Sequence, residues 1–183
     1  YEELGSVPVM TADFKVESSS DTSLVMKTQM SEGVEATRTL ALDPNKPLLK
    51  IISIYKNVSD KQITLSIRTR PTLPFKLFKD YKFYTTDKDG KWTAYDLWSK
   101  SGPDNWKYFE MSGIGKPVWM LANKEKNIAL VNRYDASAIK TLYTYYGSSY
   151  GGINMEIWGN DAILEPGQSW KLEHEFEVTK CEL

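Results

Sequence analysis

Apolar and polar residues alternate with a period of two along most of this chain, and the pattern is clearest near its end. The apolar set is Ile153, Met155 and Ile157, and the set between them is Asn154, Glu156 and Trp158. A β-strand points successive side chains to opposite faces, so we expect the first set to face a core and the second set to share the other face. An amide, a carboxylate and an indole on one face are typical of a polar ligand site.

The segment that follows predicts a turn and a closing strand. Glu165–Gln168 contains the Pro and Gly of a tight turn. After it, apolar residues from Trp170 to Val178 alternate with mainly charged ones. We therefore expect one apolar and one charged face, with His174 as a partly buried core residue on the apolar face.

Short strands separated by turn residues are predicted along the rest of the chain. They are expected at residues 12–17, 24–28, 34–42, 48–56, 62–71, 81–86, 107–111, 118–121, 127–134 and 139–146. The strand at 48–56 is almost continuously apolar, which predicts burial on both faces. Residues 96–106, with Trp98 and Trp106, are expected to form an aromatic-bearing loop. No helical periodicity persists over three turns, so the sequence predicts an all-β fold, an antiparallel two-sheet β-sandwich forming a single domain over residues 1–183.

Composition narrows the function classes. The 183 residues include 23 basic and 24 acidic side chains, a net charge of −1, which disfavours nucleic acid and anionic lipid as partners. The apolar runs are too short to span a membrane. A single His and a single Cys, without clustered ligand spacing, disfavour a metal site, and no cofactor is predicted. Nucleophilic catalysis is also disfavoured, because no Ser–His or Cys–His pair is indicated around Cys181.

The start of the sequence and its cysteine content bear on processing and compartment. Because Tyr1 stands where an initiator Met would, we expect a processed or excised segment, compatible with a secreted or periplasmic protein. The single Cys181 excludes an internal disulfide framework and leaves the compartment open. Asn57-Val58-Ser59 is a glycosylation triplet that matters only in a secreted eukaryotic protein.

Two segments together resemble the galactose mutarotase superfamily, the sugar-binding β-supersandwich that includes aldose 1-epimerases. The first runs from Leu48 to Pro74, where a buried strand, Asn57-Val58-Ser59 and a polar-faced strand are similar to the family's strand–Asn-x-Ser/Thr–strand unit. The second, Ile153 to Val178, is similar to its ending, with a Glu-bearing strand, a Pro-Gly turn and an aromatic strand. Because the family's domain is longer, the resemblance implies a reduced or C-terminal version, part of a longer chain.

The resemblance also assigns roles to particular positions. It implies that Glu156 stands where epimerases have the general base that acts on the anomeric hydroxyl. The family's histidine after the Asn-x-Ser turn is replaced by Arg70, and its second, general-acid histidine has no counterpart, since His174 is the only His. Ring opening needs both a proton donor and an acceptor, and an arginine does not release its proton. Mutarotase chemistry is therefore not expected.

The sequence is compatible with three functions. The leading one is a non-catalytic, carbohydrate-associated domain that binds a sugar through Arg70, Asn154, Glu156 and Trp158, or packs as an accessory domain on a carbohydrate-active enzyme. The second is a sugar-acting enzyme with Glu156 as general base and an unidentified acid. The third is a structural or protein-interaction domain with an aromatic interface. Arg68 is assigned to a charged surface, and the tyrosines at 143, 145, 146 and 150 to core and rim packing, with a sugar platform as the alternative.

Overall fold

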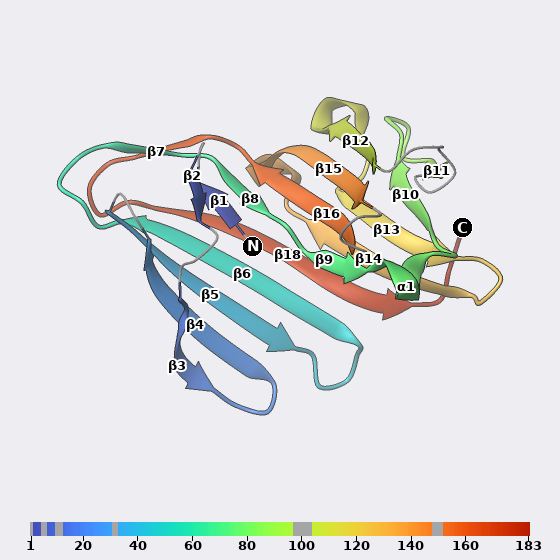
Figure 1. Cartoon of the computed structure of the whole chain (residues 1–183), viewed down its shortest axis with the longest axis horizontal. Coiled ribbons are helices and arrows are strands. Elements are labelled where there is room, and N and C mark those ends of the chain that lie inside the picture. The colour runs from blue at the N-terminus through green and yellow to red at the C-terminus, as the bar shows by residue number, and fades with distance from the viewer. Residues whose placement is uncertain (1, 5–6, 10–12, 31–32, 97–103, 148–151) are drawn as a thin grey trace.

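The alternating segments pair into antiparallel sheets in the computed structural model, which describes residues 2–4, 7–9, 13–30, 33–96, 104–147 and 152–183 (Figure 1). A nine-stranded sheet has the order β11-β10-β13-β14-β18-β6-β5-β4-β3, and a seven-stranded sheet has the order β12-β15-β16-β8-β1-β2, with β9 also paired to β16. The two strands β17 and β7 pair separately. The chain is therefore all-β, with the expected two-sheet arrangement.

The nine-stranded sheet contains strands from both halves of the chain. Its members are β3 (Lys15–Ser19), β4 (Ser23–Met30), β5 (Val34–Leu42), β6 (Leu48–Asn57), β10 (Lys82–Thr86), β11 (Trp92–Tyr95), β13 (Val118–Asn123), β14 (Ile128–Tyr134) and β18 (Ser169–Thr179). The closing strand β18 pairs with β14 on one side and β6 on the other, so it joins the two halves.

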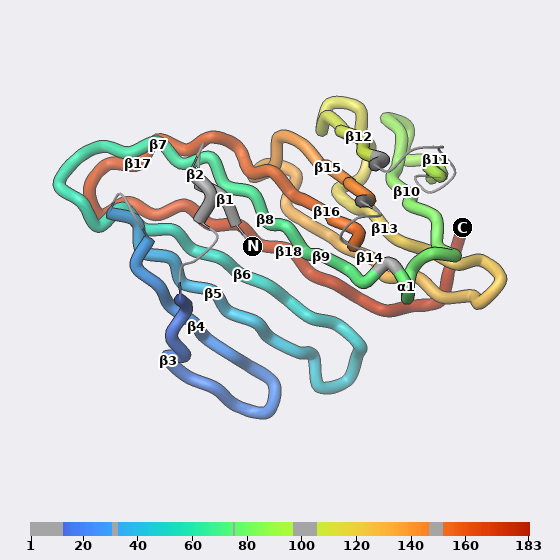
Figure 2. The backbone as a smooth tube through the Cα atoms, in the orientation of Figure 1, coloured from blue at the N-terminus to red at the C-terminus, as the bar shows by residue number. Residues whose placement is uncertain are grey.

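The seven-stranded sheet carries the segment with Glu156. Its members are β1 (Glu2–Leu4), β2 (Val7–Val9), β8 (Ile67–Thr69), β9 (Thr72–Pro74), β12 (Asp104–Glu110), β15 (Ile139–Gly147) and β16 (Gly152–Gly159). The separate pair is β7 (Ile63–Leu65) with β17 (Ala162–Leu164). The backbone trace in Figure 2 shows β16 running beside β15 on one side and the green β8–β9 segment on the other.

The core lies between the facing sides of the two sheets. Ile153, Met155 and Ile157 of β16 are at most 2% exposed and belong to one cluster with residues of the other sheet, as the alternation predicts. The rest of that cluster consists of Phe83, Phe109, Trp119, Leu121, Tyr134, Ile139, Leu142 and Leu172. Burial of these side chains is the main force that holds the sheets together.

The expectation that residues 48–56 are buried on both faces is wrong. Tyr55 of β6 is 1% exposed, whereas its neighbour Ile54 is 38% exposed. Ile54 lies on the outer side of the nine-stranded sheet, facing away from the seven-stranded one, because its partners across the strands are Thr37 and Lys171. Leu48 and Ile52, which lie on the same side of β6, are likewise only partly buried.

Two other segments differ from the expected elements. The predicted strand over residues 62–71 is two strands, because β7 pairs with β17 whereas β8 pairs with β16 and β1. Trp106 lies in strand β12 rather than in a loop, and Trp98 lies outside the described residues. The strand β17 was not predicted, because three residues between turns give too short an alternation to recognise.

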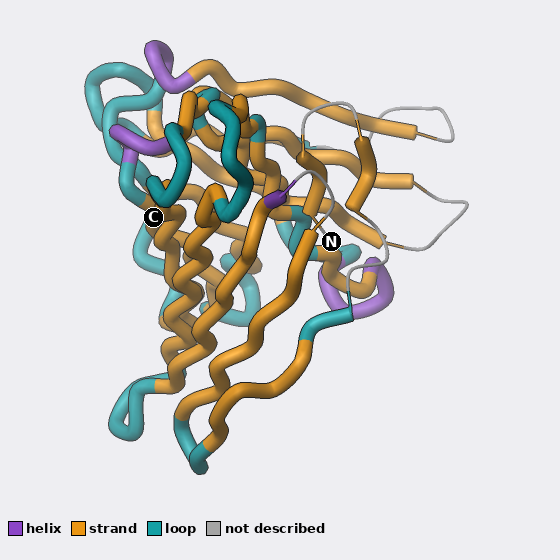
Figure 3. Tube along the Cα trace, turned by 90° about the vertical axis from the view of Figure 1, so that its left-hand side faces the viewer, coloured by secondary structure: helices purple, strands orange, loops and turns teal. Residues whose placement is uncertain are grey.

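Helix is limited to short pieces in the described residues, as Figure 3 shows from the side. These are a single turn, α1 (Phe75–Phe78), and the 3₁₀ turns η2 (Met111–Gly113) and η3 (Ala136–Ala138). Within the described ranges, no helix has the length and apolar character needed to cross a membrane. The sequence's lack of helical periodicity is thus matched by the structure.

The Asn57 side chain connects the turn between β6 and β7 to the end of β17 by hydrogen bonds. It is fully buried, and its amide donates to the carbonyl oxygens of Lys61 at 2.7 Å and Leu164 at 2.9 Å. Its oxygen accepts from the Ser59 backbone N–H at 2.9 Å. A glycan on this nitrogen would replace one of its two hydrogens and remove at least one donated bond, so the Asn-Val-Ser triplet has a structural role in the folded domain.

We expect Asn57→Ala to lower the free energy of unfolding by about 2 kcal/mol, because it leaves buried carbonyl groups without donors. Urea denaturation of the variant measures this loss. Asn45→Ala, a change on an exposed turn, is the matched control and should cost less than about 0.5 kcal/mol. Equal losses in the two variants would contradict the assigned role of Asn57.

Candidate functional site

Residues from four strands, together with Arg70 in the link between β8 and β9, meet on the outer side of the seven-stranded sheet, the side that faces away from the core. The strand register places Tyr143 opposite Glu156, Tyr108 opposite Tyr143, and Arg68 opposite Trp158. Because directly opposed residues of an antiparallel pair point to the same side, these side chains share one surface. We call the surface formed by Arg68, Arg70, Trp106, Tyr108, Tyr143, Asn154, Glu156 and Trp158 the outer aromatic face.

Glu156 lies at the centre of this face and is 1% exposed. Its Oε1 lies 2.7 Å from Arg70 Nε, and its Oε2 lies 3.9 Å from Arg68 Nη1. The Trp158 indole N–H donates to Oε2 at 2.8 Å, and the Asn154 amide donates to Oε1 at 3.4 Å. A buried carboxylate is stable only when paired and hydrogen-bonded, and this one is both.

Aromatic rings surround the carboxylate and extend outward from it. The Tyr108 ring centre lies 4.5 Å from that of Tyr143 and 5.4 Å from that of Trp158. The Arg68 guanidinium lies 4.6 Å from the centre of the Trp158 ring, a cation–π contact. The exposed fraction of the side chains rises from Glu156 outward, to 44% for Tyr108 and 57% for Trp106.

The surroundings of Tyr143 make its hydroxyl a poor acid. Burial is the main cause that raises its pKa to about 12, and the neighbouring Tyr108 and the Glu156 carboxylate add to the effect. A tyrosine with such a pKa stays protonated at neutral pH and acts as a hydrogen-bond donor or acceptor. Tyr143 is therefore unsuited to replace the missing general acid by releasing its proton near pH 7.

The structure brings the four residues proposed as ligand-binding into one group. Arg70, Asn154 and Trp158 all contact Glu156, although Glu156 itself is buried rather than solvated on an open sheet face. Arg68, expected on a charged surface, is partly exposed on this face and lies against Trp158 and near Glu156. Their roles toward a ligand remain predictions.

The aromatic residues of the neighbouring strands form a larger part of this face than their sequence pattern predicts. Tyr143 and Tyr145 are expected from the sequence to take part in core and rim packing. In the structure they lie opposite Glu156 and Asn154. This pairing could have been predicted from Gly147 and Gly152, where β15 ends and β16 begins. A hairpin closed between them fixes which residues of the two strands face each other. Tyr108 had no comparable signal, because β12 lies far from β16 in the sequence. Tyr150 lies outside the described residues.

His174 lies on the inner side of the other sheet and takes no part in this group. It is 4% exposed, and its Nδ1 lies 3.0 Å from the Asn132 side-chain nitrogen. Burial, followed by the nearby Arg38 charge, lowers its pKa to about 4. The expectation of a core histidine is confirmed. Within the described part of the chain, no group of three or more His, Cys, Asp or Glu side chains is arranged to hold a metal ion.

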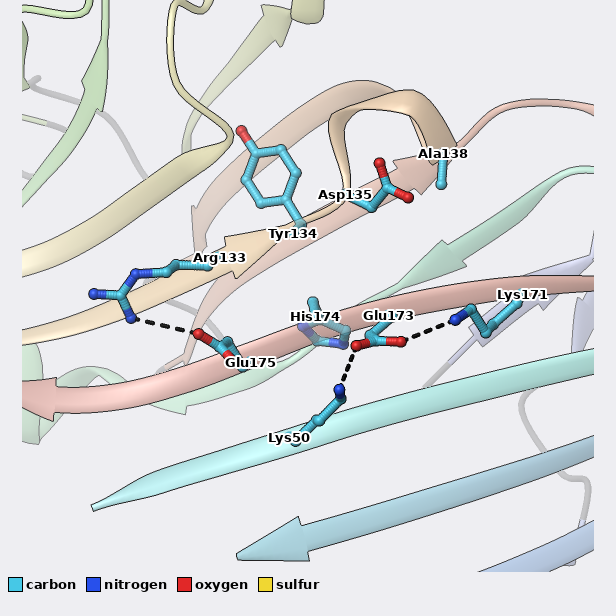
Figure 4. A pocket seen from close by; sticks show the side chains of 9 residues that line it. All are labelled: Lys50, Arg133, Tyr134, Asp135, Ala138, Lys171, Glu173, His174 and Glu175. Carbon is cyan, nitrogen blue, oxygen red and sulfur yellow. Dashed lines mark hydrogen bonds and ion pairs between the residues drawn. The ribbon is translucent and has the colours of Figure 1, made fainter. Parts of the chain in front are cut away.

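A second candidate site is a cavity of about 310 Å³ beside β14 and β18 (Figure 4). Its charged residues pair with one another. Glu173 contacts Lys50 at 2.5 Å and Lys171 at 3.0 Å, and Arg133 lies 3.7 Å from Glu175. With Asp135, the lining has three acidic and three basic residues, so it favours neither cations nor anions. The outer aromatic face is the stronger candidate.

Comparison with known proteins gives matches at the level of structure. No protein-family model matches the chain, and no curated protein matches it. A solved protein from Synechocystis sp. PCC 6803 is 15% identical with a TM-score of 0.69, over 92% of this chain and 66% of that one. A galactose mutarotase related enzyme from Lactobacillus acidophilus is 14% identical with a TM-score of 0.67, over 94% of this chain and 74% of that one.

A third structure places the fold in a longer chain. A GH36 α-galactosidase from Geobacillus stearothermophilus is 11% identical with a TM-score of 0.62, over 98% of this chain and 29% of that one. Other matches are described as galactose mutarotase-like proteins from Lactobacillus casei and Clostridium acetobutylicum. At these identities the likeness concerns the fold. The resemblance noted in the sequence is thus supported by the structure, and the chain has the antiparallel β-sandwich fold of galactose mutarotase-like proteins.

Proposed function

We propose that this domain binds carbohydrate on its outer aromatic face and does so without mutarotase chemistry. The observation that carries the proposal is the row of exposed rings, Trp106 and Tyr108, beside two arginines held in place by Glu156. A pyranose ring presents an apolar face to an aromatic ring and hydroxyl groups at its edge. Trp106 and Tyr108 can contact the apolar face of the sugar. The partly exposed Arg68 and Arg70 can donate hydrogen bonds to its hydroxyl groups.

The position of Glu156 supports the non-catalytic part of the proposal. A general base must come within hydrogen-bond distance of the proton that it removes. The Glu156 carboxylate is buried and engaged by Arg70, Asn154 and Trp158. In this arrangement it orients the two arginines instead of meeting a sugar hydroxyl itself. The fold shared with a galactose mutarotase related enzyme and a GH36 α-galactosidase supports carbohydrate as the ligand class.

Calorimetric titration with a panel of mono- and oligosaccharides tests the proposal. We expect saturable binding to at least one sugar, and Tyr108→Ala should weaken it by about tenfold, since 1.4 kcal/mol of lost contact corresponds to that factor. Tyr108 is half exposed, so its removal should leave the fold intact. Ile54→Ala, an exposed apolar change on the outer side of the other sheet, is the control and should leave the affinity unchanged. A flat response to the whole panel would reject the proposal.

A second candidate is an accessory domain that packs on a carbohydrate-active enzyme. The match to 29% of a GH36 α-galactosidase favours it, because there a domain of this fold is part of a larger chain. On this alternative, the exposed Trp106 and Tyr108 form an interface with protein. This candidate would be favoured over sugar binding if no sugar of the panel binds and the domain shows concentration-dependent association with protein that Tyr108→Ala abolishes.

A further inference from the structure

A cavity of about 180 Å³ lies where the link between β8 and β9 crosses the inner side of the nine-stranded sheet. Thr69 lines it from the end of β8 and Pro71 from the link. Met26, Leu40 and Ile51 line it from β4, β5 and β6. In Figure 1, β3, β4 and β5 extend beyond the seven-stranded sheet. Thr69 points to the opposite side of the seven-stranded sheet from the outer aromatic face, and Arg70 is the residue that the cavity and that face share.

The walls of the cavity are apolar and continue onto exposed apolar surface. Met26, Leu40 and Ile51 come from three adjacent strands, and register pairs Leu40 directly with Ile51. Beyond them, Val16, opposite Met26, is 60% exposed, and Leu42 is 53% exposed. The cavity is smaller than the several hundred cubic ångströms of a typical drug-sized site, so it suits a small molecule with a short apolar body.

The polar groups that line the cavity favour an anion. The Arg38 guanidinium lies at its wall, with Nε donating to Ser53 Oγ at 3.2 Å and Cζ lying 5.1 Å from the Phe14 ring centre. Burial lowers the pKa of Arg38, although an arginine stays charged at neutral pH. His174 is neutral there, and the cavity lining among the described residues contains no carboxylate. Arg70, which also lines it, is paired with Glu156.

Thr69 adds a hydroxyl that can donate into the cavity. The residue is 6% exposed, and within the described part of the chain its Oγ1 has no hydrogen-bond partner. A buried hydroxyl without a partner costs free energy, and a ligand oxygen beside it would remove that cost. Hydrogen bonds from a guanidinium to a carboxylate are among the stronger ones in proteins.

We propose that this cavity binds a small organic carboxylate with a short aliphatic body. The carboxylate accepts hydrogen bonds from Arg38 and the Thr69 hydroxyl, and the aliphatic body packs on Met26, Leu40 and Ile51. The two proposed hydrogen-bond donors, Arg38 and Thr69, are not part of the outer aromatic face, so the site does not depend on carbohydrate binding.

Titration with hexanoate, followed by protein-observed NMR, tests this site. We expect saturable binding with shifts at the Ile51 and Thr69 amides, and weaker binding of hexan-1-ol, which lacks the charge. Arg38→Met should weaken hexanoate binding by about tenfold or more, and Thr69→Val by about threefold, as loss of a charged and a neutral hydrogen bond predicts. Arg133→Met, an arginine on the outer side of the same sheet, is the control and should leave affinity unchanged.

Three results would overturn the proposal. The first is the absence of saturable hexanoate binding by the native protein. The second is equal binding of hexan-1-ol, which would remove the role of the carboxylate. The third is unchanged affinity in a folded Arg38→Met. If Arg38→Met does not fold, Thr69→Val decides the question, and full affinity in that variant rejects the site.

Discussion

Glu156→Gln is expected to lower the free energy of unfolding by about 3 kcal/mol, the loss typical of removing one partner from a buried ion pair. The substitution keeps the size of the side chain and removes its charge. Arg70 then stays beside a neutral amide at a position where it is only 27% exposed. Urea denaturation at neutral pH measures the loss.

A surface ion pair supplies the control for this prediction. Glu177 contacts Arg133 at the same distance, 2.7 Å, on the outer side of the nine-stranded sheet. Because that pair is screened by water, Glu177→Gln should cost at most about 1 kcal/mol. Adding Arg70→Met to Glu156→Gln should recover part of the loss, since it removes the charge left without its partner. If Glu156→Gln costs no more than Glu177→Gln, Glu156 does not hold the arginines in place.

His174 is expected to make the domain less stable as the pH falls from about 6.5 to about 4. The pKa of the folded state, about 4, lies below the ordinary value of 6.5, so the unfolded chain binds more protons between these values. Stability from this group is therefore complete above pH 6.5 and decreases with acidification. A difference of this size between the two pKa values corresponds to a loss of as much as about 3 kcal/mol.

The free energy of unfolding of the native protein and of His174→Gln, measured across pH 4 to 7, checks this prediction. Carboxylates add their own pH dependence to both proteins, so the informative quantity is the difference between them. Glutamine does not titrate and can bond to Asn132, so its curve should be flatter between pH 6.5 and 4. Parallel curves would mean that His174 titrates at its ordinary pKa in the folded protein.

Much of the fold was predictable because strand alternation is a local property. Val34–Leu42 was predicted with the bounds that the structure has, and the Gly90 and Gly167 turns both have the positive φ that glycine allows. The split at Ser66 could not be predicted in the same way, since alternation continues through it and only the partners change. The exposure of Ile54 likewise depends on which face the other sheet covers.

The candidate site was predictable where its residues share a strand. Asn154, Glu156 and Trp158 follow from the alternation of β16 alone, and the family resemblance added Arg70. Burial of Glu156 could not be predicted, because it results from side chains on β8, β12 and β15 that no local pattern connects to it. Tyr108, with its exposed ring, lies on β12, which is separated from β16 in the sheet by β15. The binding proposal depends most on this residue.

The Trp158 indole N–H gives the most direct test of the central claim, because it donates to Glu156 at the centre of the outer aromatic face. Its proton resonance can be followed by NMR during titration with the sugars that bind in calorimetry, after assignment with Trp158→Phe. If the domain binds carbohydrate there, this resonance and the Tyr143 amide shift and saturate with the calorimetric affinity. Saturable sugar binding that leaves both signals unmoved would place the ligand elsewhere and contradict the account.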